Sequence, residues 1–195
     1  MTAGQTARPN TAMHHILDNY KLLVARVDTL CSDIAVNLAE HITCSAGCSS
    51  CCTSITIFPV EAAAMQEILQ SLPELKAGEI SQYVLEHADG ERCPLLLNKH
   101  CLLYEARPII CRTHGLPIIY TSNNERNSDC CPLNMTGAES ISGSNVVDLD
   151  KLNTLLVAVN STYIAQSDDT THPERLTIAQ AITNMTSFRL YPKEP

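Results

Sequence analysis

Tryptophan is absent from this 195-residue sequence, and phenylalanine and tyrosine together supply only 4% of its residues. This scarcity argues against an aromatic-rich β-sandwich, because sheets prefer aromatic and β-branched side chains. Hydrophobic residues still make up 45% of the chain, which leaves a core of leucine, isoleucine, valine and alanine. A chain of this length can bury such a core without disulfide staples. We therefore expect one mainly α domain.

Basic residues are also scarce: 13 lysines and arginines face 21 aspartates and glutamates, for a net charge of -8. This balance argues against nucleic acid as a partner, because phosphate binding requires clustered basic side chains. No apolar run is long enough to cross a membrane, and the first 15 residues lack the apolar segment of a signal peptide. We therefore expect a cytoplasmic protein with no membrane or nucleic-acid partner, whose protein partner or substrate is unknown.

Apolar residues recur at steps of three and four near the beginning of the chain, which predicts a scaffold helix over residues 11–41. The apolar stripe consists of Ile16, Tyr20, Leu23, Val27, Leu30, Ile34 and Leu38.

Proline marks the limits of the next helix. Pro59 suits a first helical position, and Pro73 ends the helix that Pro59 begins. Residues 90–145 contain several prolines and short apolar runs, which predict loops, brief strands and one short helix. Further helices are expected over residues 75–87, 148–165 and 173–185.

The predicted organisation is a short disordered lead, residues 1–10, followed by a single domain over residues 11–190. In this domain, helical segments at residues 11–43 and 146–187 clamp an irregular, cysteine-rich core at residues 44–131.

Cysteine is the residue type that the chain has in excess, with ten copies. Four of them stand in the nine residues CSAGCSSCC, which begin at Cys44. Without a signal peptide, such crowding indicates metal ligands or redox groups more than a disulfide framework. Cys31 lies near the helical stripe and is interpreted as a small buried hydrophobe. The nine candidate ligands are Cys44, Cys48, Cys51, Cys52, Cys93, Cys101, Cys111, Cys130 and Cys131.

Soft thiolates bind zinc tetrahedrally or hold iron–sulfur clusters, and both need ligands on short loops. Gly47 relieves the backbone between the first thiols. Adjacent side chains such as those of Cys51 and Cys52 normally point apart, which suggests two neighbouring metal centres or one ligand that bridges toward a second cluster. The total suits two four-ligand sites or one multinuclear site. Buried free cysteines, or disulfides if the compartment is oxidising, are the alternatives.

The spacing of Cys44, Cys48 and Cys51 also matches the fingerprint of radical S-adenosylmethionine enzymes. Those enzymes form a partial α/β barrel and usually carry an aromatic residue before the last cysteine. Here Ser50 takes that place, a long helix comes first and no strand–helix alternation follows. The interpretation is therefore disfavoured.

A second block, CPLLLNKHCLLYEARPIICRTHG, begins at Cys93. Together the two blocks resemble the YkgJ-like cysteine-cluster family, which is described as a zinc- or iron-chelating domain. The resemblance implies metal chelation but not which metal, and related cysteine blocks occur in flagellin lysine-N-methylase, where an iron–sulfur cluster is implied. The matching residues are Cys44, Cys48, Cys51, Cys52, Cys93, Cys101, Tyr104, Arg107, Pro108, Cys111 and Arg112, with either Cys130 or Cys131 as a further cysteine.

Three side chains of the second block are candidates for contacts with a bound cofactor. Arg107 and Arg112 are interpreted as donors to sulfur or as anchors to the acidic surface, with ordinary salt bridges as the alternative. Tyr104 either packs over the cluster or belongs to the core. His100, next to Cys101, and His114, three residues after Cys111, are further candidate ligands, although such histidines more often belong to the surface or the core.

Two functions remain in competition. The first is a metal-cluster protein, holding iron–sulfur through its thiolates, with a role in redox chemistry or protein modification. The second is a zinc-stabilised structural or interaction module without catalysis. The absence of histidines at zinc-finger spacing favours iron–sulfur. The sequence has no phosphate loop, nucleophile elbow or zinc-protease helix, so any enzymatic turnover would have to take place at the metal.

The division of the cysteines predicts that Cys48→Ser and Cys111→Ser lose metal and loosen residues 90–131, because each removes a thiolate ligand. Metal content per chain and proteolysis of that segment measure both effects. Cys31→Ser is the control and keeps its metal. Loss of metal from Cys31→Ser would contradict this division of the thiols.

Overall fold

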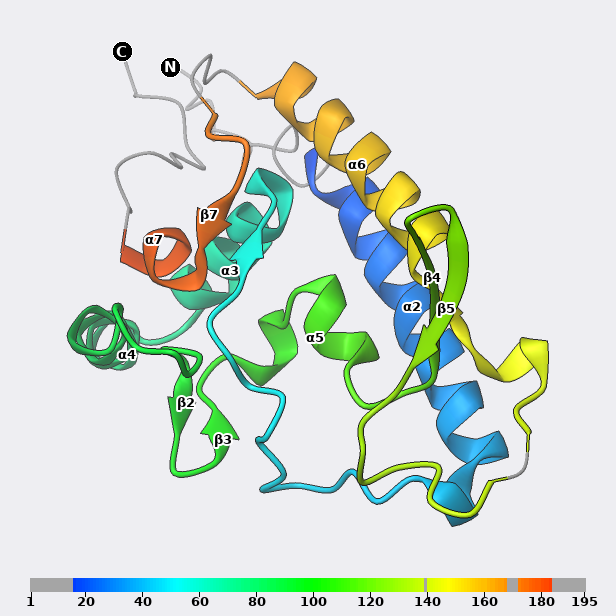
Figure 1. Cartoon of the computed structure of the whole chain (residues 1–195). Helices are drawn as coiled ribbons and strands as arrows, with labels where there is room; N and C mark the ends of the chain where they lie inside the picture. Colours follow the sequence, from blue (N-terminus) through cyan, green and yellow to red (C-terminus); the bar gives the residue numbers. More distant parts are fainter. Residues whose placement is uncertain (1–15, 139, 168–171, 184–195) are drawn as a thin grey trace, which may run out of the picture.

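The computed structural model describes residues 16–138, 140–167 and 172–183, and these form a mainly α fold with a few short strand pairs (Figure 1). The helices are α2 (Asp18–Asn37), α3 (Pro59–Ser71), α4 (Glu74–Glu86), α5 (Ile109–Thr113), α6 (Leu149–Gln166) and α7 (Ile178–Thr183). Short 3₁₀ turns are η1 (Ala39–His41), η2 (Tyr104–Ala106) and η3 (Gly143–Asn145). No helix in the described ranges is long and apolar enough to cross a membrane.

The strands in the described residues form three small sheets. β1 (Thr56–Ile57) pairs antiparallel with β7 (Leu176–Thr177), and β2 (Leu96–Leu97) pairs antiparallel with β3 (His100–Cys101). β4 (Ile118–Ser122) forms an antiparallel hairpin with β5 (Glu125–Asp129) and pairs in parallel with β6 (Val147–Asp148).

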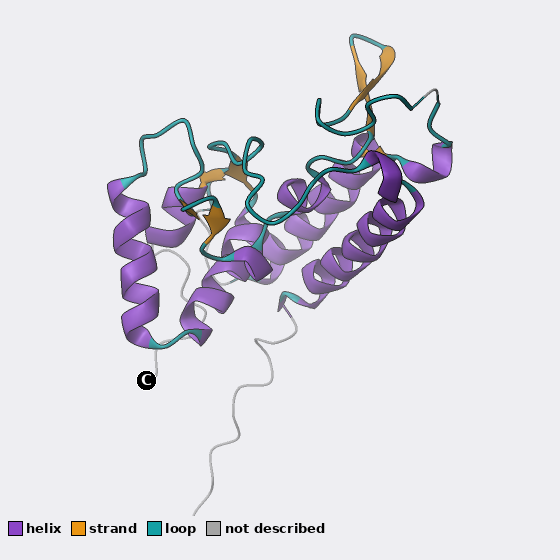
Figure 2. Cartoon of the chain, turned by 90° about the horizontal axis from the view of Figure 1, so that it is seen from below, coloured by secondary structure: helices purple, strands orange, loops and turns teal. Residues whose placement is uncertain are grey.

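Helices gather on one side of the molecule. α2 and α6 pack side by side, while α3 contacts α6, α7 and α4 (Figure 1). Seen from below, the loops and strand pairs lie together on one side of the helices (Figure 2). The loop between η1 and β1, which carries the first cysteine block, passes beneath α5 (Figure 1). The loops and strand pairs, including the first cysteine block, therefore lie against the helices.

The predicted stripe of the first helix is largely buried. Tyr20, Leu23, Val27 and Ile34 are inside, whereas Leu30 lies at the edge of the stripe and stays 39% exposed. The helix ends at Asn37, earlier than predicted, because the chain tightens into η1. The predicted residues 11–15 and the disordered lead lie outside the described residues.

The other helices follow their local signals. Pro59 is the first residue of α3, and the side chain of Asp148 caps α6 by accepting a hydrogen bond from the Lys151 N–H at 3.2 Å. The segment predicted as helix over residues 173–185 instead begins with β7, because Leu176 and Thr177 pair with β1, and α7 starts only at Ile178.

A buried carboxylate joins two helices at their N-termini. Glu61 is 3% exposed, and its oxygens accept the Phe58 N–H at 2.9 Å and the Ile109 N–H at 3.0 Å. Burial raises the pKa of this carboxyl, while the two N–H donors oppose the rise. These N–H groups belong to the N-cap residue of α3 and to the first residue of α5, where no intrahelical acceptor exists. Glu61 therefore holds α5, which carries Cys111, against α3.

Arg112 joins α5 to α2 from another direction. Its Nη1 donates to both carboxylate oxygens of Asp28, at 2.7 and 2.8 Å. Its Nε and Nη2 donate to the carbonyl oxygens of Arg107 and Glu105, at 2.8 and 2.7 Å. The Arg112 side chain is only 7% exposed, whereas its partner Asp28 is 46% exposed. The bonds to the two carbonyl oxygens fix the turn that precedes α5.

We predict that Glu61→Ala lowers the free energy of unfolding by about 2–4 kcal/mol, because two buried N–H groups lose their acceptor. Urea denaturation of the metal-free protein measures this change. Glu67→Ala, which removes only an exposed ion pair with Lys21, is the matched control and costs less than about 1 kcal/mol. Equal effects of the two substitutions would contradict the role given to Glu61.

Candidate metal centre

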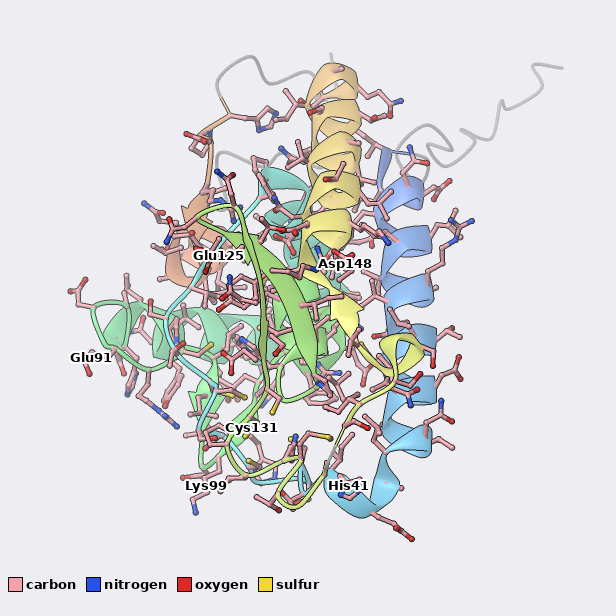
Figure 3. The ribbon with its side chains drawn as sticks, turned by 45° about the vertical axis from the view of Figure 1, so that its right-hand side comes forward. His41, Glu91, Lys99, Glu125, Cys131 and Asp148 are labelled. Atoms are coloured by element: carbon pink, nitrogen blue, oxygen red, sulfur yellow. The ribbon has the colours of Figure 1, made fainter. Side chains whose placement is uncertain are left out.

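The two cysteine blocks line one cavity of about 610 Å³. Figure 3 shows sulfur atoms gathered in the lower part of the molecule, around the labelled Cys131 and near Lys99. All ten cysteines lie in the described part of the chain and are free thiols. Seven of them line the cavity, namely Cys44, Cys48, Cys51, Cys52, Cys93, Cys101 and Cys111.

The first block forms two successive turns. The Cys48 N–H donates to the Ser45 carbonyl at 3.0 Å, and the Cys52 N–H donates to the Ser49 carbonyl at 3.1 Å. Gly47 has a φ of +90°, so the predicted relief of the backbone at this position is confirmed. Through these turns, without a regular helix or strand, all four thiols of the block contribute to the cavity lining.

Backbone bonds tie the second block to the first. The Cys93 N–H donates to the Cys52 carbonyl at 3.1 Å, and Thr53 forms an isolated antiparallel bridge with Arg92. The Arg92 side chain donates to the Ser49 carbonyl at 2.7 Å. These contacts join segments about forty residues apart in sequence and bring Cys93 beside Cys52.

Local structure then brings in the remaining thiols. The Leu96 N–H donates to the Cys93 carbonyl at 3.0 Å, and Leu96 pairs with Cys101 across β2 and β3. Cys111 is the middle residue of the short helix α5. Cys101 and Cys111 therefore reach the cavity from a hairpin and from a short helix.

Cys52, Cys93, Cys101 and Cys111 are half-buried, and we call them the inner group. Burial, followed by negative charge on the other three thiols, raises the pKa of the Cys111 thiol to about 12. Burial likewise raises the pKa of Cys93 to about 11, with further contributions from Cys101 and Cys52. Negative charge on one thiolate thus makes ionisation of its neighbours less favourable. A cation bound among the thiols compensates this repulsion and favours their ionised form.

Cys44, Cys48 and Cys51 are exposed, and we call them the outer group. Burial raises the pKa of Cys51, and negative charge on Cys52, Cys48 and Cys44 raises it further. The adjacent pair of Cys51 and Cys52 thus joins the two groups along the chain.

Of the three predicted cofactor contacts, two line the cavity and one does not. Arg107 and Tyr104 line the cavity; the Arg107 guanidinium lies 3.5 Å from the centre of the Tyr104 ring, and its Nε donates to the Tyr104 carbonyl at 2.9 Å. Tyr104 is 56% exposed, so it is not a core residue. Positive charge on Arg107 lowers the pKa of Cys101 against the dominant effect of burial. Arg112 lies outside the lining and bonds to Asp28.

Two histidines also line the cavity. His100 is exposed, and its Nδ1 lies 2.8 Å from the Asn98 carbonyl. Burial lowers the pKa of His114, which favours the neutral ring that ligates metals. His114 is thus the histidine better suited to join the thiols.

The remaining three cysteines are not among the residues that line the cavity. Cys31 packs against the core from α2, as predicted, and burial raises its pKa to about 11. Neither Cys130 nor Cys131 is among the residues that line the cavity, and both are half-buried in the loop after β5. The Cys130 N–H donates to the Asp129 carboxylate at 2.7 Å. Their role as ligands stays a prediction.

Sequence reasoning missed two residues next to Cys44. A Cβ at Gly115, whose φ is +92°, would lie 2.7 Å from the Cys44 Sγ. Asn134 donates from its Nδ2 to the same sulfur at 3.3 Å. Gly115 carries only the signal of a glycine that follows a helix, and no local pattern marks Asn134.

The donor set fits zinc or an iron–sulfur cluster, because both take thiolates and seven thiols share one cavity. Among the described residues, no three histidine, cysteine, aspartate or glutamate side chains are arranged with metal-binding geometry. The fit therefore rests on donor chemistry and on the shared cavity.

We predict that Gly115→Ala lowers metal occupancy, because its Cβ must displace the Cys44 sulfur. Metal analysis of the purified variant measures the loss. Gly137→Ala is the control, since Gly137 has a similar φ of +84° but a Cβ at that position would have no neighbouring atom within 4 Å. Equal occupancy in the two variants would show that the contact with Cys44 is unimportant.

The chain was compared with known proteins. No curated protein and no solved structure matches it. Residues 43–132 match the family model CxxCxxCC, described as "Putative zinc- or iron-chelating domain". The match covers both cysteine blocks and the cavity that they line. This part of the chain is therefore similar to the CxxCxxCC domain.

Proposed function

We propose that the chain holds an iron–sulfur cluster through thiolates of both cysteine blocks and that it works in redox chemistry or protein modification. One observation carries the proposal: seven cysteines from two sequence blocks line a single cavity. The family model that matches residues 43–132 supports metal binding itself. The iron–sulfur assignment and the redox role are our inference.

The size of the cavity favours a cluster over a single zinc ion. Zinc with four bonds of about 2.3 Å holds its sulfurs only about 3.8 Å apart, so that they enclose a single ion. A cluster places iron and sulfide between its cysteines and so needs the ligands further apart. A cavity of about 610 Å³ with thiols around it suits the larger group.

The inner group supplies four thiolates for such a cluster, and Cys44 of the outer group lies in the same cavity as a further candidate ligand. Cys52 comes from the first block, and Cys93, Cys101 and Cys111 come from the second. These thiols are half-buried, and partial exclusion of water protects a cluster and adjusts its potential. Arg107 in the cavity wall offsets part of the negative charge that the thiolates bring.

The outer group lies at the exposed part of the cavity, where a protein partner or substrate can approach. Exposed thiols beside a redox centre suit electron exchange or the modification of a bound protein. A reducing compartment such as the cytoplasm keeps these thiols available. We also propose that the bound group orders the loops between the flanking helices, which clamp this region.

Zinc is the second candidate, and the outer group supports it. With His114 from the cavity wall, Cys44, Cys48 and Cys51 form a Cys₃His donor set, which is a common structural zinc set. In this case the metal stabilises the loops, and function belongs to the helical surfaces.

Metal analysis of protein purified without oxygen tests the proposal. We expect about four irons and about four acid-labile sulfides per chain, with a brown colour, as a [4Fe–4S] centre requires. A chelator that removes the iron should bleach the colour and loosen residues 43–132. Zinc without sulfide would overturn the iron–sulfur assignment and favour the structural module.

A further inference from the structure

We infer that Asn134 is a positioning residue for the metal centre, which directs the Cys44 sulfur into the cavity by a hydrogen bond from its side-chain amide. The inference rests on the proposal that Cys44 contributes to the metal site. Asn134 lies two residues beyond the segment matched to the family, 43–132.

Asn134 is buried, and both the oxygen and the NH₂ group of its side chain form hydrogen bonds. It is 3% exposed, and its Oδ1 accepts the Thr43 N–H at 2.9 Å and the Thr43 hydroxyl at 3.1 Å. Its Nδ2 donates to the Gly115 carbonyl at 2.6 Å and to the Cys44 Sγ at 3.3 Å. One amide thus joins three segments that are far apart in the sequence.

The partners fix the orientation of this amide. The Thr43 backbone N–H can only donate, so the side-chain oxygen of Asn134 must face it. The Gly115 carbonyl can only accept, so the NH₂ group must face Gly115. The second N–H of that group is then free to donate to the sulfur of Cys44, whose distance of 3.3 Å suits an N–H···S bond.

The backbone around Asn134 holds it in place. Its own N–H donates to the Cys131 carbonyl at 2.8 Å, and the next N–H, of Met135, donates to the His41 carbonyl at 2.8 Å. The Cys44 sulfur therefore lies between the Asn134 amide and the close backbone of Gly115. Both contacts come from outside the first block and restrict where this exposed cysteine can point.

A donor to a ligating sulfur has a chemical consequence as well as a steric one. Hydrogen bonds to the sulfurs of a cluster are among the factors that set its reduction potential. Partners of metal ligands typically change metal affinity by about 10- to 100-fold when they are replaced. Asn134 should therefore influence both the affinity and the potential of the centre.

Asn134→Asp is the sharpest variant, because the carboxylate keeps the acceptor for Thr43 but has no N–H for Cys44 or Gly115. We expect the Cd²⁺ affinity of the metal-free protein, measured by competition with a chromophoric chelator, to fall by about tenfold or more. Thr43→Ala removes a hydroxyl partner of Asn134 but leaves the N–H···S bond, so it should change the affinity by less than about twofold. Equal losses in the two variants, or no loss in Asn134→Asp, would overturn the inference.

A double-mutant cycle separates a bond to Cys44 from a general effect on the loop. In a Cys44→Ser background, Asn134→Asp should cost little further Cd²⁺ affinity, because the sulfur has already been removed. A full additive loss would contradict the inference. In reconstituted protein, Asn134→Asp should also make the potential of the iron–sulfur centre more negative.

The wild-type protein offers a test that does not depend on a variant that folds. In ¹¹³Cd-loaded protein, the side-chain amide proton of Asn134 should shift and show coupling to cadmium across the N–H···S bond. An amide signal unchanged by cadmium would overturn the inference. A failure of the wild type to take up iron and sulfide would refute the proposed function alone, because the cadmium readouts do not require a cluster.

Discussion

A buried carboxylate bonded to two helix N-termini is the interaction on which the arrangement of the metal centre depends. Glu61 accepts the N–H groups of Phe58 and Ile109 and so joins α3, which belongs to the core, to α5. α5 has only five residues and could not stand alone. Its attachment through Glu61, with Arg112 bonded to Asp28 on the opposite side, gives Cys111 a fixed place in the cavity wall.

The rest of the candidate metal centre is formed by loops, which a small number of hydrogen bonds hold together. The Cys93–Cys52 backbone bond brings the two blocks together, and the β2–β3 hairpin adds Cys101. Half-burial of these thiols raises their pKa values and opposes their ionisation, so the cavity is unfavourable for thiolates until a cation enters it. Because the raised pKa values keep the thiols protonated in the metal-free site, metal binding releases protons. Metal binding is also coupled to the ordering of the loops that carry the thiols.

The sequence predicted what local patterns encode. Pro59 indicated where α3 begins, the helix predicted over residues 148–165 matches α6, and the crowded thiols indicated the candidate metal centre. It could not predict the β1–β7 pair, because two-residue strands carry no alternation. Nor could it reveal Asn134, whose contact with Cys44 joins residues ninety positions apart. The predicted ligands Cys130 and Cys131 rested on thiol chemistry and on the family resemblance, and neither is among the residues that line the cavity.

The most direct test of a single centre built by both blocks is an anomalous-scattering map from crystals of the metal-loaded protein. We predict metal density within the cavity, bonded to at least one thiol of the first block and to Cys93, Cys101 or Cys111 of the second. Metal bound by one block alone, or held at Cys130 and Cys131 outside the cavity, would contradict a shared centre.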